Sequence, residues 1–148
     1  MAVNATFTDI KAGIGCPMCP DTHGEDVVAA LTSGHVHLQN DAGYRGYCIL
    51  IFHRHAVELH DLTPEERQNW IEDIAAVGKA ISTVCGAAKL NVSMLGNQVP
   101  HLHCHIIPRY PEDGEWGHPP AFRPPADRDH LTDEEFADLR SRLAHELA

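Results

Sequence analysis

HLHCHII, residues 101–107, carries a histidine at every second position. Successive side chains of a β-strand point to opposite faces, so a strand here would carry His101, His103 and His105 on one face. Its other face, made by the residues in between, would be apolar. Burying three imidazoles without partners would cost about 1–3 kcal/mol for each unpaired nitrogen. The stretch therefore predicts a strand whose apolar face packs on the core and whose histidine face forms the floor of a cleft.

The spacing of the three histidines limits the metal sites that they can form. At about 3.3 Å per residue, His101 and His105 would lie roughly 13 Å apart at the backbone, so the three rings cannot share one ion. A pair such as His101 and His103 could still do so. The pattern leaves open both a reactive His103 and a catalytic metal held by that pair.

The flanking sequence predicts an α+β fold. Apolar runs of strand length, separated by turn residues, lie at residues 27–31, 35–39, 47–52, 90–95 and 101–107. A capping box at residues 63–66 begins a long helix with apolar residues at helical spacing, and Gly86 ends it. A second capping box at Thr132 begins a C-terminal helix. This order predicts a mainly antiparallel five-stranded sheet with one long helix and one C-terminal helix.

Length and composition favour a single domain. The chain has 148 residues, of which 43% are hydrophobic. We expect a core with the N-terminal cysteine segment at residues 1–110, and a Pro-rich loop and C-terminal helix packed on the same domain at residues 111–148. The net charge of −10 disfavours nucleic acid as a partner. No apolar run of membrane length and no secretory signal are visible, so we expect no membrane partner and a cytoplasmic location.

Cys16 and Cys19 have the two-residue spacing at which both thiolates can bind one zinc ion. The chain holds five cysteines, an odd number that suits a reducing compartment better than a disulfide framework. The pair therefore indicates a metal clip, while two unligated cysteines in a loop remain the alternative. The other three cysteines are expected to be small buried side chains.

The chain resembles the histidine-triad (HIT) family. The motif of that family is His, apolar, His, apolar, His, apolar, apolar, and residues 101–107 match all seven positions. The resemblance extends through residues 46–55, the helix start at residues 59–66 and the early cysteine pair. It implies a HIT-like fold for about residues 16–110.

The resemblance also implies a chemistry. In the family the middle histidine attacks the α-phosphate of a nucleotide and forms a nucleotidyl-histidine, which water or another acceptor then resolves. By resemblance His103 is the nucleophile, with His105 placed to bind phosphoryl oxygens or to carry a proton, and His101 completes the catalytic triad. Neutral imidazole is nucleophilic near pH 7, so this assignment is chemically sound. The expected substrate is a dinucleoside polyphosphate or a nucleoside phosphoramidate.

Some family members hold a structural zinc ion with two cysteines and two histidines. Carried over to this chain, the ligands are Cys16, Cys19, His55 and His101. His53 lies two residues before His55 and is the alternative fourth ligand. Four protein ligands leave no open position for water, so the implied zinc would be structural.

The turn before the histidines departs from the commoner pattern of the family. Residues 96–100 read GNQVP, where many members have a turn of the Gly-Gln-Ser type. We expect Asn97, Gln98 and Asn91 to bind the substrate, although Asn97 could simply form the turn. The departure leaves the leaving group undecided.

Other readings of the sequence remain open. The chain could be a nucleotidylyltransferase or phosphorylase, or a zinc-stabilised nucleotide-binding module without turnover. Arg109 follows the histidine strand and could offset phosphate charge near the mouth of the cleft, but we expect it to be an exposed arginine. The resemblance also implies a homodimer, with Trp116 as a residue that could cover the site of a partner.

Overall fold

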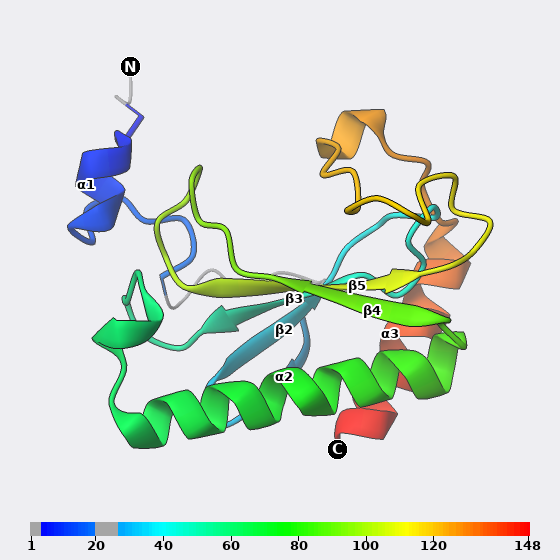
Figure 1. Ribbon diagram of the computed structural model, residues 1–148, viewed down its shortest axis with the longest axis horizontal. Helices are drawn as coiled ribbons and strands as arrows, with labels where there is room; N and C mark the ends of the chain where they lie inside the picture. The colour runs from blue at the N-terminus through cyan, green and yellow to red at the C-terminus, as the bar shows by residue number, and fades with distance from the viewer. Residues whose placement is uncertain (1–3, 20–26) are drawn as a thin grey trace.

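A five-stranded antiparallel sheet forms the centre of the computed structural model, which describes residues 4–19 and 27–148 (Figure 1). In spatial order the strands are β1 (Val27–Ala30), β2 (Gly34–Leu38), β3 (Cys48–Phe52), β5 (His103–Arg109) and β4 (Lys89–Ser93). Each neighbouring pair in this order is antiparallel. The predicted α+β class and antiparallel five-stranded sheet are confirmed.

Two capped helices cover one face of the sheet. Helix α2 (Pro64–Cys85) begins at Thr63, whose hydroxyl accepts a hydrogen bond from the Glu66 backbone N–H at 3.2 Å. It ends at Gly86, where φ is +65°, a conformation that glycine adopts without strain. Helix α3 (Asp133–Leu147) begins with the same kind of capping box at Thr132 and packs against α2 and β1. Both predicted helices are therefore present at their predicted starts.

Helix α2 runs along one face of the sheet (Figure 1), and side chains of the two form the core. Residues at helical spacing on α2 meet residues at alternate positions of the central strands. Deeply buried members of this contact include Trp70, Val77, Ile81, Leu50, Phe52, Cys104 and Ile106. Burying one such large apolar side chain contributes about 1.5–3 kcal/mol. The core thus fixes which face of β5 turns away from α2.

Strand β5 is displaced by two residues from its predicted position. The expected strand 101–107 is observed at His103–Arg109, so both predicted ends are wrong, and the strand continues through Pro108. Proline removes only its own N–H, and the ladder continues beyond it because the Arg109 carbonyl accepts from Ala88 at 3.0 Å. His101 lies before the strand, where its N–H donates to the Val99 carbonyl at 2.8 Å. The strand face therefore carries His103 and His105 but not His101.

The shorter helices lie outside this core. They are α1 (Phe7–Lys11) and the 3-10 helices η1 (Leu59–Asp61) and η2 (Pro125–Asp127). Figure 1 shows α1, the loop between β4 and β5 and the segment containing η2 on the side of the sheet opposite to α2. Within the described residues, no helix combines the length and apolarity needed to cross a membrane. The loops above the exposed face of the sheet are the elements that build the site.

Candidate functional site

Four potential metal ligands gather beside the start of β5. Donor atoms of Cys16, Cys19, His55 and His101 all lie within 4.8 Å of one another, and we refer to these residues as the Cys–His cluster. The Cys16 Sγ lies 3.4 Å from His101 Nδ1, and the Cys19 Sγ lies 3.3 Å from His55 Nδ1. Zinc bonds of about 2.3 Å to sulfur and 2.0–2.1 Å to nitrogen at tetrahedral angles separate the two ligand atoms by about 3.6 Å. The spacing of the cluster therefore fits a tetrahedral ion.

The outer nitrogen of each cluster histidine is held by a backbone carbonyl. His101 Nε2 lies 2.9 Å from the Phe52 carbonyl, and His55 Nε2 lies 3.1 Å from the Lys11 carbonyl. A carbonyl only accepts, so each Nε2 carries the proton and each Nδ1 keeps its lone pair toward the sulfur atoms. This is the arrangement that orients histidine for a metal.

The N-terminal segment reaches the sheet by a sharp turn after α1. Gly13 has a φ of +86°, and a Cβ built on it would lie 3.5 Å from the His55 ring. The turn brings Lys11 against His55 and leads directly to the two cysteines. Burial, followed by interaction with Cys16, raises the pKa of the Cys19 thiol to about 11. The thiolate form therefore needs a cation, which the donor set and its spacing can accommodate.

His53, the alternative fourth ligand, is not part of the Cys–His cluster. Its side chain is 43% exposed, and its Nε2 lies 4.0 Å from a carboxylate oxygen of Glu66. The described cluster uses His55 instead.

His103 has a fixed tautomer. Its Nδ1 lies 2.6 Å from the His101 carbonyl oxygen, so Nδ1 carries the proton and Nε2 keeps a lone pair. Burial lowers the pKa of His103, which favours the neutral ring. His101 thus contacts the Cys–His cluster through its ring and orients His103 through its backbone.

His105 is the neighbour of His103 on the strand face, with ring centroids 5.0 Å apart. Burial, together with repulsion from His103 and Arg128, lowers the pKa of His105 to about 4. The Tyr47 hydroxyl lies 2.5 Å from His105 Nδ1 and fixes the ring on its outer side. Two neutral imidazoles therefore lie side by side at neutral pH.

A cavity of about 570 Å³ opens over these two rings. Its lining residues come from β3, the turn before β5 and a segment near the C-terminus. They include Met18, Tyr47, Ile49, residues 95–99, His103, His105, residues 122–125 and Arg128. We refer to this space as the histidine cavity. Its volume falls within the range of small-molecule sites.

The predicted substrate-binding residues separate into two groups. Asn97 and Gln98 line the histidine cavity. Asn91 does not line it, because its Oδ1 accepts a hydrogen bond from Arg109 Nη1 at 2.7 Å. The structure thus brings Asn97 and Gln98, but not Asn91, to His103 and His105.

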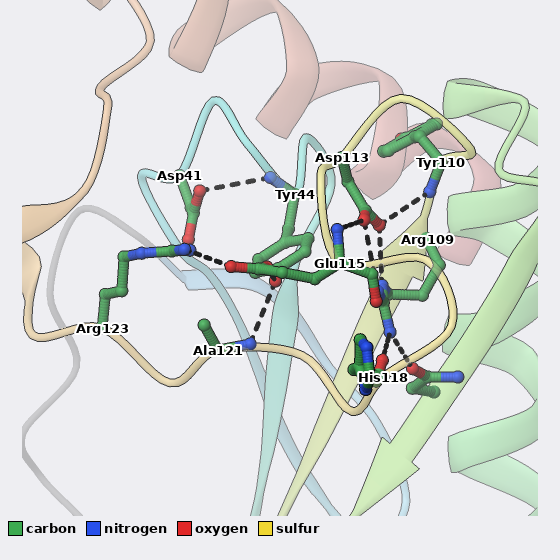
Figure 2. A network of polar contacts seen from close by, with 10 residues as sticks. Asp41, Tyr44, Arg109, Tyr110, Asp113, Glu115, His118, Ala121 and Arg123 are labelled. Atoms are coloured by element: carbon green, nitrogen blue, oxygen red, sulfur yellow. Dashed lines mark hydrogen bonds and ion pairs between the residues drawn. The ribbon is translucent and has the colours of Figure 1, made fainter.

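Arg109 is buried, which corrects the expectation of an exposed arginine. Its side chain is 3% exposed and forms an ion pair with Asp113 at 2.7 Å. The guanidinium also donates to the carbonyls of Glu115 and His118 (Figure 2). Its five N–H donors meet four acceptors of the following loop and the side-chain oxygen of Asn91 on β4. Arg109 therefore fixes the loop after β5 instead of facing phosphate.

Figure 2 shows the polar contacts that connect this loop to Tyr44 and Arg123. Glu115 accepts a hydrogen bond from the Tyr44 hydroxyl and pairs with Arg123. The same hydroxyl accepts from the Ala121 backbone N–H at 3.0 Å. These contacts fix the segment that carries Arg123 beside the histidine cavity.

Several cavity residues were not expected from the sequence. Tyr47 begins the predicted strand at residues 47–52 and was assigned no role in the site, although its alternation with Ile49 places both on the histidine side. Phe122, Arg123 and Arg128 lie in a Pro-rich stretch whose irregular pattern gives no periodic signal. The two arginines, in a chain with a net charge of −10, were the available signal.

Comparison with known proteins agrees with this geometry. The family model described as the HIT domain matches residues 24–112. A histidine triad (HIT) protein from Sinorhizobium meliloti has 26% identity and a TM-score of 0.73, over 82% of this chain and 90% of that chain. A histidine triad protein from Bradyrhizobium japonicum has 29% identity and the same TM-score, over 84% and 92%.

Curated relatives match over a shorter stretch. A bis(5'-nucleosyl)-tetraphosphatase (asymmetrical) from Schizosaccharomyces pombe is 34% identical over 46% of this chain and 40% of its own length. A bis(5'-adenosyl)-triphosphatase from Saccharomyces cerevisiae is 37% identical over 36% of this chain and 29% of its own length. The matches thus span less than half of these relatives.

Proposed function

Because the chain belongs to the histidine-triad (HIT) family, we propose that it is a nucleotide hydrolase that forms a nucleotidyl-histidine on His103. One observation carries the proposal. The His103 Nδ1–H is bound to the His101 carbonyl, so the lone pair of Nε2 belongs to a neutral ring that lines a cavity of about 570 Å³. The relatives named as dinucleoside polyphosphate hydrolases support a substrate of that class.

The proposed reaction has two displacements at the α-phosphorus. In the first, the His103 Nε2 lone pair forms an N–P bond, and the bond from phosphorus to the bridging oxygen breaks with its electron pair on the leaving phosphate. In the second, water attacks phosphorus and loses a proton to the solvent, the N–P bond breaks, and the electron pair returns to Nε2. One water is consumed, and a mononucleotide and a nucleoside polyphosphate are released. The intermediate divides one difficult step into two easier ones.

His105, Asn97 and Gln98 would support both displacements. A neutral His105 whose Nδ1 accepts from Tyr47 carries its proton on Nε2, where it can donate to a phosphoryl oxygen. The side-chain amides of Asn97 and Gln98 and the N–H groups of their turn are further donors at the cavity. Asn91 has no part in this proposal because Arg109 occupies its side-chain oxygen.

We further propose that the Cys–His cluster holds one structural zinc ion. Cys16, Cys19, His55 and His101 would be its four ligands, which leaves no position for substrate. When bound, zinc supplies a rigid clip between the N-terminal segment and the sheet and no step of the reaction. A reducing compartment, the cytoplasm of our prediction, would keep both thiols available for it.

A homodimer remains part of the proposal. Strand β4 is an outer strand of the sheet, and exposed apolar residues lie on it and just after it. Val92 is 48% exposed and Leu95 is 57% exposed. Pairing of such edges would cover them. Light scattering coupled to gel filtration would report the mass of the assembly.

Trapping the intermediate tests the proposed chemistry. The protein is mixed with labelled dinucleoside polyphosphate and quenched in alkali, where a phosphoramidate bond to histidine survives. We expect label on the wild type and on His145→Ala, a control in an exposed histidine of α3, but not on His103→Gln. Equal labelling of His103→Gln would refute the assignment.

Two further measurements separate the hydrolase from its alternatives. Turnover in ¹⁸O-water should place the isotope in the mononucleotide, because water resolves the adduct. A nucleoside diphosphate formed in the presence of inorganic phosphate would indicate a phosphorylase instead. Binding of nucleotide without adduct or products would indicate a module without turnover.

A further inference from the structure

One wall of the histidine cavity comes from residues 122–128, which lie beyond the stretch matched by the HIT-domain model at residues 24–112. The Phe122 ring contacts the His105 ring with centroids 5.2 Å apart. Arg123 and Arg128 both line the cavity beside it. This wall is therefore supplied by a part of the chain that the family model does not describe.

The charge of the wall contrasts with that of the whole protein. The chain has a net charge of −10, yet no Asp or Glu is among the described residues that line the histidine cavity. Arg123 and Arg128 are its two permanently charged lining residues. Low-dielectric walls strengthen the local field of such charges. The charged side chains that line the cavity are therefore positive, opposite in sign to the net charge of the protein.

Arg128 is held in place before any ligand arrives. Its Nε donates to the Arg123 carbonyl at 2.9 Å, and its Nη1 donates to Gln39 Oε1 at 3.3 Å. Its guanidinium carbon lies 5.7 Å from the centre of the Tyr47 ring, whose hydroxyl contacts His105. Neither bond uses Nη2, so the guanidinium can still donate to a ligand. Its position therefore links the wall to the histidines through Tyr47.

Arg123 is held by a carboxylate that lies outside the histidine cavity. Its Nη2 pairs with Glu115, which does not line the cavity and is itself held by Tyr44. Asp41 has a similar place behind Arg128, with a carboxylate oxygen 3.8 Å from Nε. These acidic residues orient the two guanidinium groups without entering the cavity. Preorganised donors bind without an ordering cost at the moment of binding.

We propose that Arg123 and Arg128 bind the phosphate chain of the leaving group and so select substrates with several phosphates over those with an uncharged leaving group. The inference rests on the proposed function and gives it a substrate class. In an in-line displacement the leaving group lies opposite the attacking nitrogen of His103. Arginine donates to phosphate oxygens in a bidentate manner and keeps its charge at all working pH values.

The test compares two substrates with the same nucleotide and different leaving groups. One is diadenosine tetraphosphate, whose leaving group is an anionic nucleoside triphosphate. The other is an adenosine phosphoramidate, whose leaving group is a small uncharged amine. The variants are Arg123→Gln, Arg128→Gln and the charge-matched control Arg142→Gln, which removes a half-exposed arginine from α3. Thermal unfolding of each variant reports whether the fold is kept.

Loss of each charged hydrogen bond should lower kcat/KM for the tetraphosphate roughly 10- to 100-fold. Turnover of the phosphoramidate should change less than about threefold, as should both substrates with Arg142→Gln. An equal loss on both substrates would overturn the inference, because it would indicate a general effect on the cavity. No loss on either would also overturn it.

A binding measurement keeps the inference separate from the proposed function. Calorimetry compares the affinities of adenosine tetraphosphate and adenosine monophosphate for the wild type and for both variants. We expect the preference for the tetraphosphate to fall roughly 10-fold or more in Arg123→Gln and Arg128→Gln. If the variants keep the wild-type preference for the tetraphosphate, the proposed role of Arg123 and Arg128 is refuted, even if the protein hydrolyses neither substrate. If the preference falls as expected but the wild type shows no turnover, only the proposed hydrolase activity is refuted.

Discussion

His101 and His103 are two residues apart, yet their rings have opposite surroundings. The His101 ring is part of the Cys–His cluster, where sulfur atoms lie on one side and the Phe52 carbonyl on the other. The His103 ring uses one nitrogen for the His101 carbonyl and keeps the other for the histidine cavity. The contrast shows that the partner of one ring nitrogen decides what the other can do.

The two regions also differ in what they can exchange with solvent. The Cys–His cluster brings four donor atoms together, and four such ligands on a tetrahedral ion would leave no coordination position for a further ligand. The histidine cavity is open and has neutral rings at its floor, because burial lowers the pKa of both His103 and His105. One region is suited to stability and the other to chemistry, and His101 connects them through its backbone.

The largest effect is expected at the nucleophile. His103→Gln should lower kcat/KM on a dinucleoside polyphosphate by about 10⁴-fold or more, equivalent to about 5.5 kcal/mol of transition-state stabilisation. Unfolding temperature and zinc content should stay close to those of the wild type, because the cluster is intact. Steady-state kinetics with metal analysis measures both. Activity retained by His103→Gln would contradict its role as the nucleophile. Loss of zinc from this variant would contradict the separation of the Cys–His cluster from the histidine cavity.

The second effect concerns the Cys–His cluster. Cys19→Ser should remove zinc and lower stability by about 4 kcal/mol, a fall of roughly 10 °C in Tm. Activity should fall as well, because the backbone of His101 orients His103. His53→Ala is the matched control, since this exposed histidine lies outside the cluster. Normal zinc content in Cys19→Ser, determined by mass spectrometry, would contradict the ligand set.

The sequence predicted most of what depends on local pattern. The capping boxes at Thr63 and Thr132 fixed the starts of α2 and α3, because a cap needs only residues three apart. Alternation correctly assigned Cys104 and Ile106 to the core. The start of β5 was missed because it depends on bonds to distant partners, as when Leu102 N–H donates to the Ala56 carbonyl at 2.7 Å.

Only those residues of the candidate site that belong to a sequence motif could be predicted. The grouping of Cys16, Cys19, His55 and His101 was implied by the family resemblance and is present in the structure. The burial of Arg109 was not predictable, because its acceptors come from a loop without periodic pattern. Arg123 and Arg128 were missed for the same reason, since tertiary contacts alone bring their segment to the cavity.

The third effect concerns the ion pair of Arg109 and Asp113, which holds the loop leading to the histidine cavity and does not belong to the Cys–His cluster. Asp113→Asn leaves the buried Arg109 without its anion and should destabilise the protein by about 2–3 kcal/mol. Zinc content should not change, because the Cys–His cluster does not contact this pair. Chemical denaturation and metal analysis give the two quantities. Arg142→Gln is a control for an exposed ion pair and should cost less than about 1 kcal/mol.

The pH dependence of this difference has a definite sign. Hydrogen bonding to Arg109 lowers the pKa of Asp113 from 3.8 to about 2 in the folded protein. The unfolded chain therefore binds a proton before the folded protein does, and the stabilisation is lost as pH falls. The difference in free energy of unfolding between the wild type and Asp113→Asn should be constant above about pH 5 and should decrease between about pH 4 and 2. A difference that increases in acid would contradict the ion pair.

The smallest effect tests the other end of the histidine face. Burial raises the pKa of the Tyr47 phenol, which stays protonated and can donate to His105 Nδ1. A hydrogen bond to the neutral ring disfavours its protonated form, so Tyr47→Phe should raise the pKa of His105 above the wild-type value of about 4. Loss of about 1 kcal/mol corresponds to a rise of roughly 0.7 pKa unit. NMR titration of the His105 ring measures the shift. A fall in the pKa of His105 would contradict this arrangement. It would mean that the Tyr47 hydroxyl accepts from Nδ1–H and that Nε2 presents a lone pair, not a proton, to the cavity.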